Sequence, residues 1–149
     1  MSSIYLDTSV ISALFDEREP SRKQITDLWF NKYLHRYDVY ISQVVIEELS
    51  RNQEPVRSKT LNRTQKLDLL PHTEGIEKLA ERILIEKVLP AKSAADALHL
   101  SYAIVFEIDF LVSWNFKHLA NVRRQTKLQR FSVEHGLFIT KLVNPMYLF

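Results

Sequence analysis

Short apolar runs alternate with longer amphipathic stretches along this chain of 149 residues. The runs have the length of strands and predict the following ones: Ile4–Leu6, Asp38–Ile41, Leu67–Pro71, Phe110–Ser113 and Leu137–Ile139. Between them apolar residues recur at helical spacing, which predicts helices over 10–15, 25–34, 44–49, 74–89, 94–105 and 116–128. The polar residues 51–66 are compatible with a further helix. Alternation of strands and helices with short connections indicates an α/β fold with a mostly parallel central sheet.

Small polar residues precede several of the predicted helices and are candidate N-caps. Thr8 or Ser9 would cap the first helix, and Ser42 would cap the helix after the second strand. Ser93 and Asp96 have the Ser-x-x-Asp spacing of a capping box. These residues mark where we expect the helices to begin.

The composition is that of one globular domain, residues 1–149, since hydrophobic residues make up 46% and charged residues 26% of the chain. No repeat or linker interrupts the pattern. With only two glycines, the chain has no glycine-rich loop to cradle a phosphate. It has no cysteine, which excludes disulfides, thiolate zinc sites and cysteine nucleophiles. Any phosphate must therefore be bound by other groups.

No part of the sequence resembles a targeting signal or a membrane anchor. The N-terminus lacks the basic and long apolar segments of an export signal. No window approaches the roughly 18 consecutive apolar residues of a transmembrane helix. Together with the lack of cysteine, this predicts a cytoplasmic protein with no membrane partner.

The net charge of +2 conceals an uneven distribution along the chain. Residues 1–50 sum to −3 and residues 67–115 to −4, whereas residues 51–66 sum to +4 and residues 116–149 to +5. This asymmetry favours an acidic working centre whose basic flanks meet a polyanion. Solvation of two helix faces by Lys and Arg would explain the same charges.

Acidic or amide side chains follow several of the predicted strands. They are Asp7 after the first strand, Glu48 in the helix after the second, Asp96 in the first turn of its helix, and Asn115 after the 110–113 strand. Because the carboxyl ends of parallel strands meet at one edge of a sheet, these four side chains can converge there. Converging carboxylates repel one another unless a cation neutralises them, and oxygen ligands suit Mg²⁺ or Mn²⁺. Such an ion would activate water against a phosphodiester.

Each acidic residue also has a purely structural interpretation. Asp96 could serve only in its capping box, Asp7 could begin a turn, and Glu48 could reach from an apolar helix face to solvent. We expect Asp109 to begin a strand from a turn, away from any site. Position in the sequence alone leaves the structural and catalytic interpretations open.

Other polar residues give weaker indications. His99 and His118 each follow a candidate ligand by three residues, although packed or surface histidines are more common than functional ones. Ser113 could hydrogen-bond a phosphate or a metal-associated water, or merely cap a helix. Trp114 could stack on a base, but a core position is the expected one.

Four segments of the chain resemble, in order, the PIN-domain family, which includes metal-dependent ribonucleases and the VapC-type toxins of bacterial toxin–antitoxin pairs. They are Ile4–Ile11, Ile41–Leu49, Ala95–Leu100 and Leu111–Asn121. The acidic or amide positions within them are separated by 41, 48 and 19 residues. The resemblance covers about residues 4–145, nearly the whole chain.

The resemblance implies a three-layer α/β/α sandwich and hydrolysis of single-stranded RNA at a Mg²⁺ or Mn²⁺ centre. It assigns catalytic and metal-binding roles to Asp7, Glu48 and Asp96. In the fourth position, usually Asp, this chain has Asn115. An amide oxygen can still ligate, but the lost charge should weaken a second metal ion. The stretch around Asn115 resembles a branch of the family in which Asn commonly occupies this position.

The expected function is therefore a metal-dependent endoribonuclease, in which the basic segments 51–66 and 116–130 steer RNA towards the site. The expected partners are RNA, a cognate antitoxin and a second copy of the chain. Apolar helices such as 75–89, and residues in the first two helices, could form the dimer interface, but the same residues could be core. Two alternatives remain at this point: a PIN-like protein that binds RNA without cutting it, and an unrelated α/β binding protein.

Overall fold

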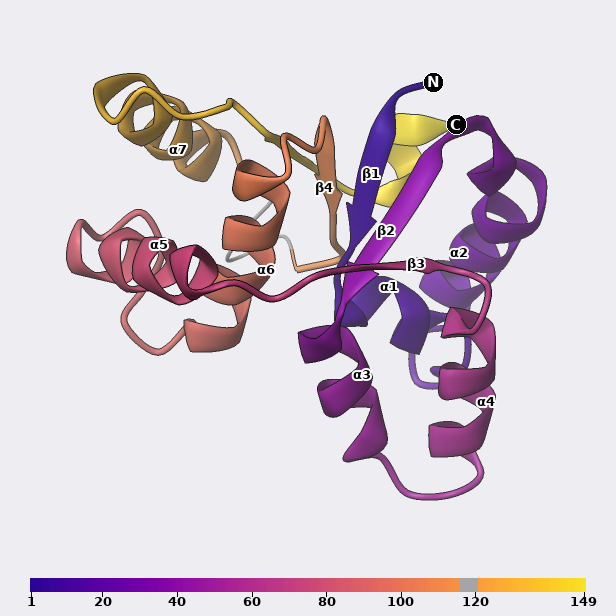
Figure 1. The fold of residues 1–149 in the computed structure, drawn as a ribbon. Coiled ribbons are helices and arrows are strands. Elements are labelled where there is room, and N and C mark those ends of the chain that lie inside the picture. The colour runs from indigo at the N-terminus through magenta and orange to yellow at the C-terminus, as the bar shows by residue number, and fades with distance from the viewer. Residues whose placement is uncertain (116–120) are drawn as a thin grey trace.

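The computed structural model describes residues 1–115 and 121–149, in which a five-stranded sheet lies between two layers of helices (Figure 1). The strands are β1 (Ser3–Leu6), β2 (Asp38–Ser42), β3 (Asp68–Leu70), β4 (Phe110–Val112) and β5 (Lys141–Val143). Their order is β3-β2-β1-β4-β5, and all four neighbouring pairs are parallel. The α/β fold with a parallel sheet is confirmed.

The helices divide between the two faces of the sheet (Figure 1). One layer holds α1 (Thr8–Ala13), α2 (Pro20–Lys32), α3 (Gln43–Ser50) and α4 (Val56–Thr64), and the other holds α5 (Glu74–Ile85), α6 (Ala94–Val105) and α7 (Val122–Glu134). Two 3₁₀ turns, η1 (Leu34–Arg36) and η2 (Pro145–Leu148), complete the chain. Right-handed crossovers explain the division, because β2 and β3 are added on one side of β1 while β4 and β5 are added on the other.

The core is built around β1, whose Ile4, Tyr5 and Leu6 are fully buried. Leu111 and Val112 of β4 are equally buried, as the uninterrupted apolar run there predicts. Helix α6 packs against β4, and α5 packs on α6. The most apolar helix of the sequence is thus the inner one of its layer.

The last strand lies later in the chain than the sequence pattern predicts. Gly136, with φ 64°, follows the end of α7, and the chain then runs without regular structure until β5 at Lys141–Val143. Ile139 of the predicted strand is 42% exposed, whereas Leu142 and Val143 are buried and pair with β4. Both segments are short apolar runs, so hydrophobicity alone did not distinguish them.

Some helix boundaries also differ from the prediction. Helix α2 begins at Pro20 rather than near residue 25, since proline is favoured in the first turn of a helix. Helix α7 ends at Glu134 rather than at residue 128, and Asn121 caps its N-terminus. The predicted start of this helix at residue 116 and the residue His118 lie outside the described residues.

The N-caps differ from those expected. Asp7, not Thr8 or Ser9, caps α1, because its carboxylate accepts a hydrogen bond from the Ser9 amide. Ser42 and Ser93 precede their helices, but neither side chain makes a capping hydrogen bond. The Ser42 hydroxyl is used elsewhere, as described below.

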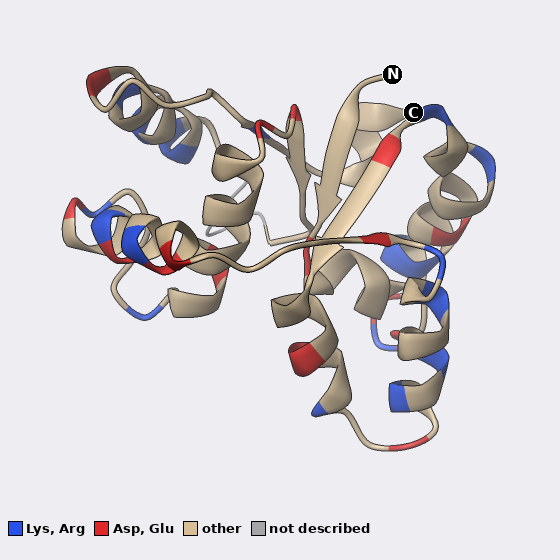
Figure 2. Ribbon diagram, in the orientation of Figure 1, with Lys and Arg blue, Asp and Glu red and all other residues tan. Residues whose placement is uncertain are grey.

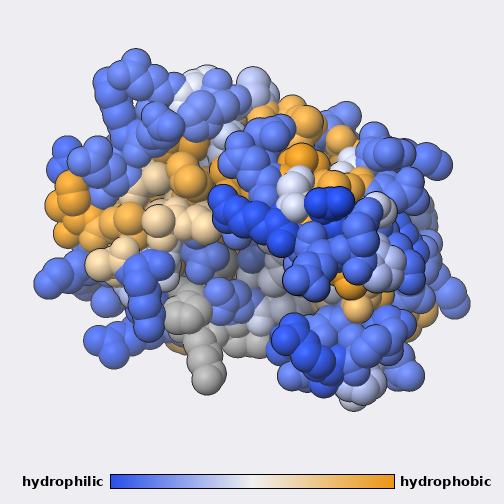
Figure 3. Space-filling model, turned by 90° about the horizontal axis from the view of Figure 1, so that it is seen from below, coloured by the Kyte–Doolittle hydropathy of each residue, from blue (hydrophilic) through white to orange (hydrophobic). Residues whose placement is uncertain are grey.

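The face onto which the carboxyl ends of the strands open is seen from below in Figure 3. It is largely hydrophilic, and its apolar side chains gather mainly at the left edge, on the side where α5 lies in Figure 1. Among the described helices, none combines the length and the apolar character needed to cross a membrane.

Candidate functional site

The direction in which strands are added reverses at β1, which pairs with β2 on one side and with β4 on the other. Ligands of parallel α/β sheets bind at the carboxyl ends of the strands beside such a reversal. Asp7 directly follows β1, and Ser113 and Asn115 follow β4. These residues therefore lie at the edge where a site is expected.

Asp7 is a buried carboxylate, with 3% of its surface exposed. Its Oδ1 accepts hydrogen bonds from the Ser9 amide at 3.0 Å and from the Ser9 hydroxyl at 2.5 Å. Burial raises the pKa of Asp7 above its usual range, although the nearby His99 and the hydroxyls of Ser113 and Ser9 act in the opposite direction. The folded chain thus holds the charged form of Asp7 at a cost in free energy.

Two serine hydroxyls join the segment after β1 to the segment after β4. The Oγ atoms of Ser9 and Ser113 are 3.4 Å apart, and the Trp114 amide donates to Ser9 Oγ at 2.9 Å. The backbone amide of Asn115 donates to Ser113 Oγ, also at 2.9 Å. These bonds fix the position of Asn115 relative to Asp7.

Glu48 lies in the second turn of α3 and is held by two side chains. His99 Nε2 lies 2.7 Å from its Oε1, and the Thr8 hydroxyl donates to the same oxygen at 2.7 Å. Burial tends to raise the pKa of Glu48, but the hydrogen bond and charge of His99, together with the Thr8 hydroxyl, lower it below its usual range. Glu48 is therefore held as a carboxylate.

His99 is 2% exposed and connects Glu48 to the core. Its Nδ1 lies 2.7 Å from the Tyr5 hydroxyl, which lies 2.6 Å from the Ser42 hydroxyl. Burial raises the pKa of Tyr5 well above its usual value, so the phenol stays protonated. Because the Glu48 carboxylate only accepts, His99 must donate from Nε2, and its Nδ1 makes the hydrogen bond to the Tyr5 hydroxyl. The hydrogen-bond chain orients Glu48 from inside the fold.

Asp96 and Asn115 form the second part of the site. Asn115 Nδ2 lies 3.3 Å from Asp96 Oδ2, and both residues line an open pocket together with Lys92 and Ser93. Asp96 occupies the first turn of α6, at the helix end that carries the partial positive charge of the helix dipole. This pair faces solvent more than Asp7 does.

Three of the four predicted ligands fall into two groups at one edge, Glu48 with His99 and Asp96 with Asn115, and the fourth is Asp7. The segment Asp7–Ser9 joins the groups, because Thr8 bonds Glu48 while Ser9 bonds Asp7 and contacts Ser113. Across residues 1–115 and 121–149, no three Asp, Glu or His side chains lie close enough together to share one ion. The donors are nevertheless oxygens, and the buried Asp7 charge is one that a cation would stabilise, so the set fits Mg²⁺ or Mn²⁺ in chemistry.

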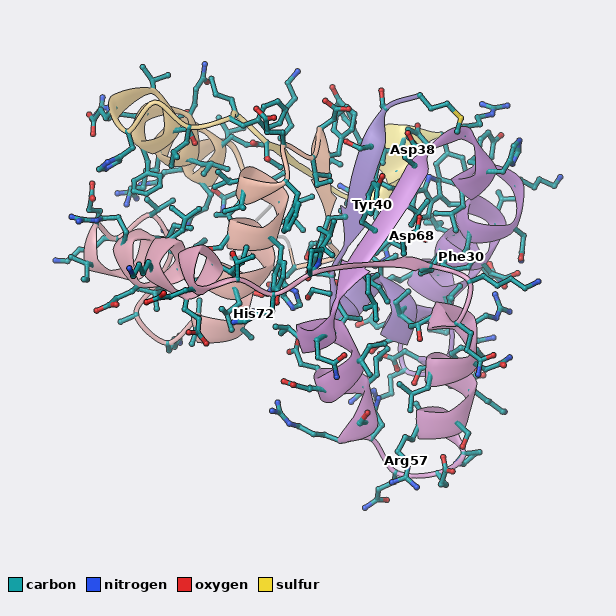
Figure 4. All side chains as sticks on the ribbon, viewed as in Figure 1. Phe30, Asp38, Tyr40, Arg57, Asp68 and His72 are labelled. Atoms are coloured by element: carbon teal, nitrogen blue, oxygen red, sulfur yellow. The ribbon has the colours of Figure 1, made fainter. Side chains whose placement is uncertain are left out.

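Asp109 and Trp114 occupy the structural positions expected of them. Asp109 accepts from the Ser3 amide at 2.9 Å, at the amino end of β4 and away from the site. Asp38 and Asp68 begin their strands, and Figure 4 shows Asp38 at the far end of β2. Trp114 is 6% exposed and its Nε1 donates to Thr26 Oγ1 at 2.8 Å, so it belongs to the core as expected.

His99 has a larger role than the packed or surface position expected of it. The residue is packed, yet its Nε2 contacts a predicted ligand. The helical spacing of three residues from Asp96 was the one available signal, and Tyr5, in the strand that ends at Asp7, gave none. The partners that define this role come from β1, α3 and α6, which only the fold brings together.

Comparisons with known proteins agree with this fold. The profile of the PIN domain matches residues 4–123. The crystal structure of Mycobacterium tuberculosis VapC20, a toxin that cleaves the sarcin-ricin loop, is similar with a TM-score of 0.56 and 21% sequence identity, covering 76% of this chain and 91% of that one.

A structure of VapBC2 from Rickettsia felis, bound to a DNA fragment from the promoter of its genes, has a TM-score of 0.58 and 18% identity. The match covers 95% of this chain and 98% of that chain. No protein of curated function matches the sequence significantly. At these identities the solved structures establish a shared fold.

Proposed function

This chain belongs to the PIN domain family, and on that premise we propose that it is a metal-dependent endoribonuclease that hydrolyses phosphodiester bonds in RNA. The observation that carries the proposal is the buried Asp7 carboxylate at the reversal point of the sheet, joined through Thr8 and Ser9 to Glu48 and to the segment that holds Asn115. A carboxylate held there at a cost in free energy is characteristic of a functional site.

Each residue of the site has a distinct role in this proposal. Asp7, Glu48 and Asp96 would hold Mg²⁺ or Mn²⁺, with the Asn115 amide oxygen as an auxiliary ligand. Because no three of the described Asp, Glu and His side chains lie close enough to share one ion directly, part of this set would act through the ion's own waters. When bound, the ion supplies Lewis-acid polarisation of the phosphate and activation of water. The exposed Lys92 ammonium at the rim of the Asp96 pocket would contact a phosphate oxygen of the substrate.

Two residues act through Glu48 rather than on the substrate. His99 donates from Nε2 and Thr8 from its hydroxyl to the same carboxylate oxygen, which leaves Glu48 Oε2 to face a ligand. Groups that orient a metal ligand in this way affect metal affinity or activity by about 10–100-fold. His99 and Thr8 are therefore positioning residues.

The test is cleavage of a single-stranded RNA by the purified chain with Mn²⁺, compared with EDTA and with Asp96→Asn. We expect internal cuts that require the metal and that the substitution abolishes. Asp68→Asn, at the exposed start of β3, is the matched control and should cut normally. Cleavage that survives both EDTA and Asp96→Asn would overturn the proposal, because it would not come from the candidate site. A copurified nuclease would give such cleavage, since the substitution does not affect it.

We further propose that the chain is the toxin of a toxin–antitoxin pair and that a small cognate antitoxin binds it. The similarity to VapC20, itself a toxin, supports this role. Expression should arrest growth, Asp96→Asn should relieve the arrest, and coexpression of the antitoxin should restore growth. Harmless expression of the active enzyme would contradict the toxin role but not the nuclease.

A second candidate is a PIN domain that binds RNA without cutting it. The pairing of Asp96 with a neutral Asn115 favours it, because one negative charge of the usual four acids is absent. This alternative predicts RNA affinity without metal-dependent turnover, and it predicts no turnover in Asn115→Asp either. The cleavage assay above separates the two.

A further inference from the structure

An open groove lies between α7 and the end of α5. Its charged lining consists of Glu86, Lys87, Arg123, Lys127, Arg130 and Glu134. Figure 2 shows the basic positions on α7, across from α5 in the same layer. Glu86 is already engaged by Arg82 at 3.6 Å and by His135 at 3.0 Å, so four cations face only one other carboxylate, Glu134, in the lining.

The cations of this groove are available to a ligand. Lys87, Arg123, Lys127 and Arg130 are exposed, and none of them takes part in an ion pair with another described residue. The three on α7 are four and three residues apart, a spacing that places them on one face of the helix. They form a row of positive charge about 10 Å long, from the helical rise per residue.

Two segments of the chain connect the groove to the candidate site. Residues 86–88 line the groove, and Lys92 and Ser93 of the same loop line the pocket of Asp96 and Asn115. On the other side, α7 begins seven residues after Asn115. Arg124 Nη1 donates to the Val88 carbonyl at 2.9 Å and fixes α7 to that loop.

The other basic segment, α4 with its flanking residues, differs in this respect. Arg57 lies 3.7 Å from Glu54, and the Arg63 guanidinium lies over the rings of Phe15 and Phe30 at 5.6 and 5.7 Å. Figure 4 labels Arg57 at the start of α4, far from the sheet. The cations of α4 thus partly serve the fold, whereas Arg123, Lys127 and Arg130 of α7 form no ion pair with a described residue.

We infer that the α7 groove binds the phosphate backbone of RNA beyond the cleaved bond and leads it to the Asp96 pocket. The inference rests on the proposed nuclease function and names the surface that holds its substrate. Phosphates are the ligand that a row of exposed Arg and Lys attracts, and such contacts carry most of the affinity for single strands of any sequence.

The test compares two variants that lose the same charge. One carries Arg123→Gln, Lys127→Gln and Arg130→Gln, and the other carries Arg57→Gln, Lys59→Gln and Lys66→Gln. Binding of a fluorescent single-stranded RNA longer than about 16 nucleotides is measured in EDTA by anisotropy, so cleavage does not interfere. We expect about 10-fold weaker binding for the α7 variant and less than about 2-fold for the α4 variant.

Salt dependence gives a second readout. Each lost phosphate contact on a single strand lowers the slope of log K against log salt by about 0.7, so the α7 variant should lose about two units of slope. The α4 variant should keep the slope of the wild type. Equal losses in the two variants would overturn the inference, because they would indicate only long-range attraction.

Lys87→Gly tests whether weaker RNA binding could result from loss of folding. Lys87 has φ 57°, a conformation that favours glycine, so the substitution should raise the melting temperature while it weakens RNA binding. Unchanged binding with a raised melting temperature would count against the groove. Poly-glutamate that displaces RNA better than poly-uridylate of equal length would identify an acidic protein as the ligand and overturn the inference.

Failure of this inference is distinguishable from failure of the proposed function. If the α7 variant binds and cleaves RNA like the wild type, the groove is not used and the nuclease stands. If the wild-type chain neither binds nor cleaves RNA, the nuclease proposal fails, and the groove proposal fails with it.

Discussion

Asp7 and Glu48 lie at the same edge of the sheet, but the fold treats their charges in opposite ways. Burial raises the pKa of Asp7, and its hydrogen bonds do not compensate. Burial also acts to raise the pKa of Glu48, but His99 and Thr8 lower it below the usual range. The folded chain therefore favours the charge of Glu48 and disfavours the charge of Asp7.

The opposite pKa shifts indicate that the charge of Glu48 contributes to the stability of the fold and that the charge of Asp7 reduces it. A carboxylate surrounded by donors stabilises the chain that holds it, whereas a desolvated carboxylate reduces stability unless a cation is bound. Functional residues are often retained at such a cost. The protein therefore holds the Glu48 carboxylate in place without an ion, whereas the charge of Asp7 is stabilised only when a cation binds.

The largest expected effect is on activity, from Asp7→Asn. We expect Mn²⁺-dependent cleavage to fall by about 10²-fold or more, the scale seen when one charge-stabilising group of a site is removed. Asparagine is as good an N-cap as aspartate, so α1 should remain intact. Asp38→Asn, at the other end of the sheet, is the control and should cleave at the normal rate. A normal cleavage rate in Asp7→Asn would show that Asp7 is not part of the site.

Removal of His99 tests the other half of the comparison. In His99→Ala the Glu48 carboxylate and the Tyr5 hydroxyl lose a partner, so cleavage should fall by about 10–100-fold and the free energy of unfolding by about 2–4 kcal/mol. His99→Gln can donate to Glu48 and accept from Tyr5, and it should recover most of both. Rates and denaturant unfolding are measured side by side.

Two outcomes would contradict a purely positioning role for His99. Recovery of stability but not of rate in His99→Gln would show that the ring acts beyond holding Glu48. Equal rates in His99→Ala and the wild type would show that Glu48 needs no support.

Asn115→Asp changes the less buried pair. A second carboxylate beside Asp96 Oδ2 should repel it without metal and attract an ion more strongly, so we expect a lower melting temperature in EDTA and about 10-fold tighter Mn²⁺ binding. Calorimetric titration with Mn²⁺ measures the affinity. Unchanged affinity would place Asn115 away from the ion.

The smallest expected effect is on the pH dependence of stability in EDTA. Asp7→Asn should be more stable than the wild type above the raised pKa of Asp7, and this gain should vanish as the pH falls through that pKa towards the ordinary value of 3.8. Glu48→Gln should be less stable than the wild type above the ordinary value of 4.5. That deficit should vanish as the pH falls through the lowered pKa of Glu48, so the two difference curves have opposite signs.

The sheet was predictable where burial imposes a distinct pattern. β1 and β4 are covered on both faces, so their apolar runs stand out from the polar segments around them. β5 was misplaced because Leu137–Ile139 and Lys141–Val143 are both short apolar runs, and only pairing with β4 selects the second. Helix starts were less accurate, because caps depend on hydrogen bonds that residue type does not fix.

The candidate site shows the same limit. Spacing and resemblance predicted Asp7, Glu48, Asp96 and Asn115 at one edge, since each follows a strand or begins a helix near one. Ser42 was expected to cap α3, but its hydroxyl turns to Tyr5 and so to His99. Contacts between elements that are distant in the sequence decide these roles, and no local pattern encodes them.

The response of the melting temperature to Mn²⁺, in the wild type and in Asp7→Asn, tests most directly whether the fold holds Asp7 for a cation. We predict that the wild type melts lower than Asp7→Asn in EDTA and rises by several degrees with Mn²⁺, because binding to the native state stabilises it. Asp7→Asn should show little response. An Asp7→Asn chain that is less stable in EDTA, or that gains as much from Mn²⁺ as the wild type, would contradict the account.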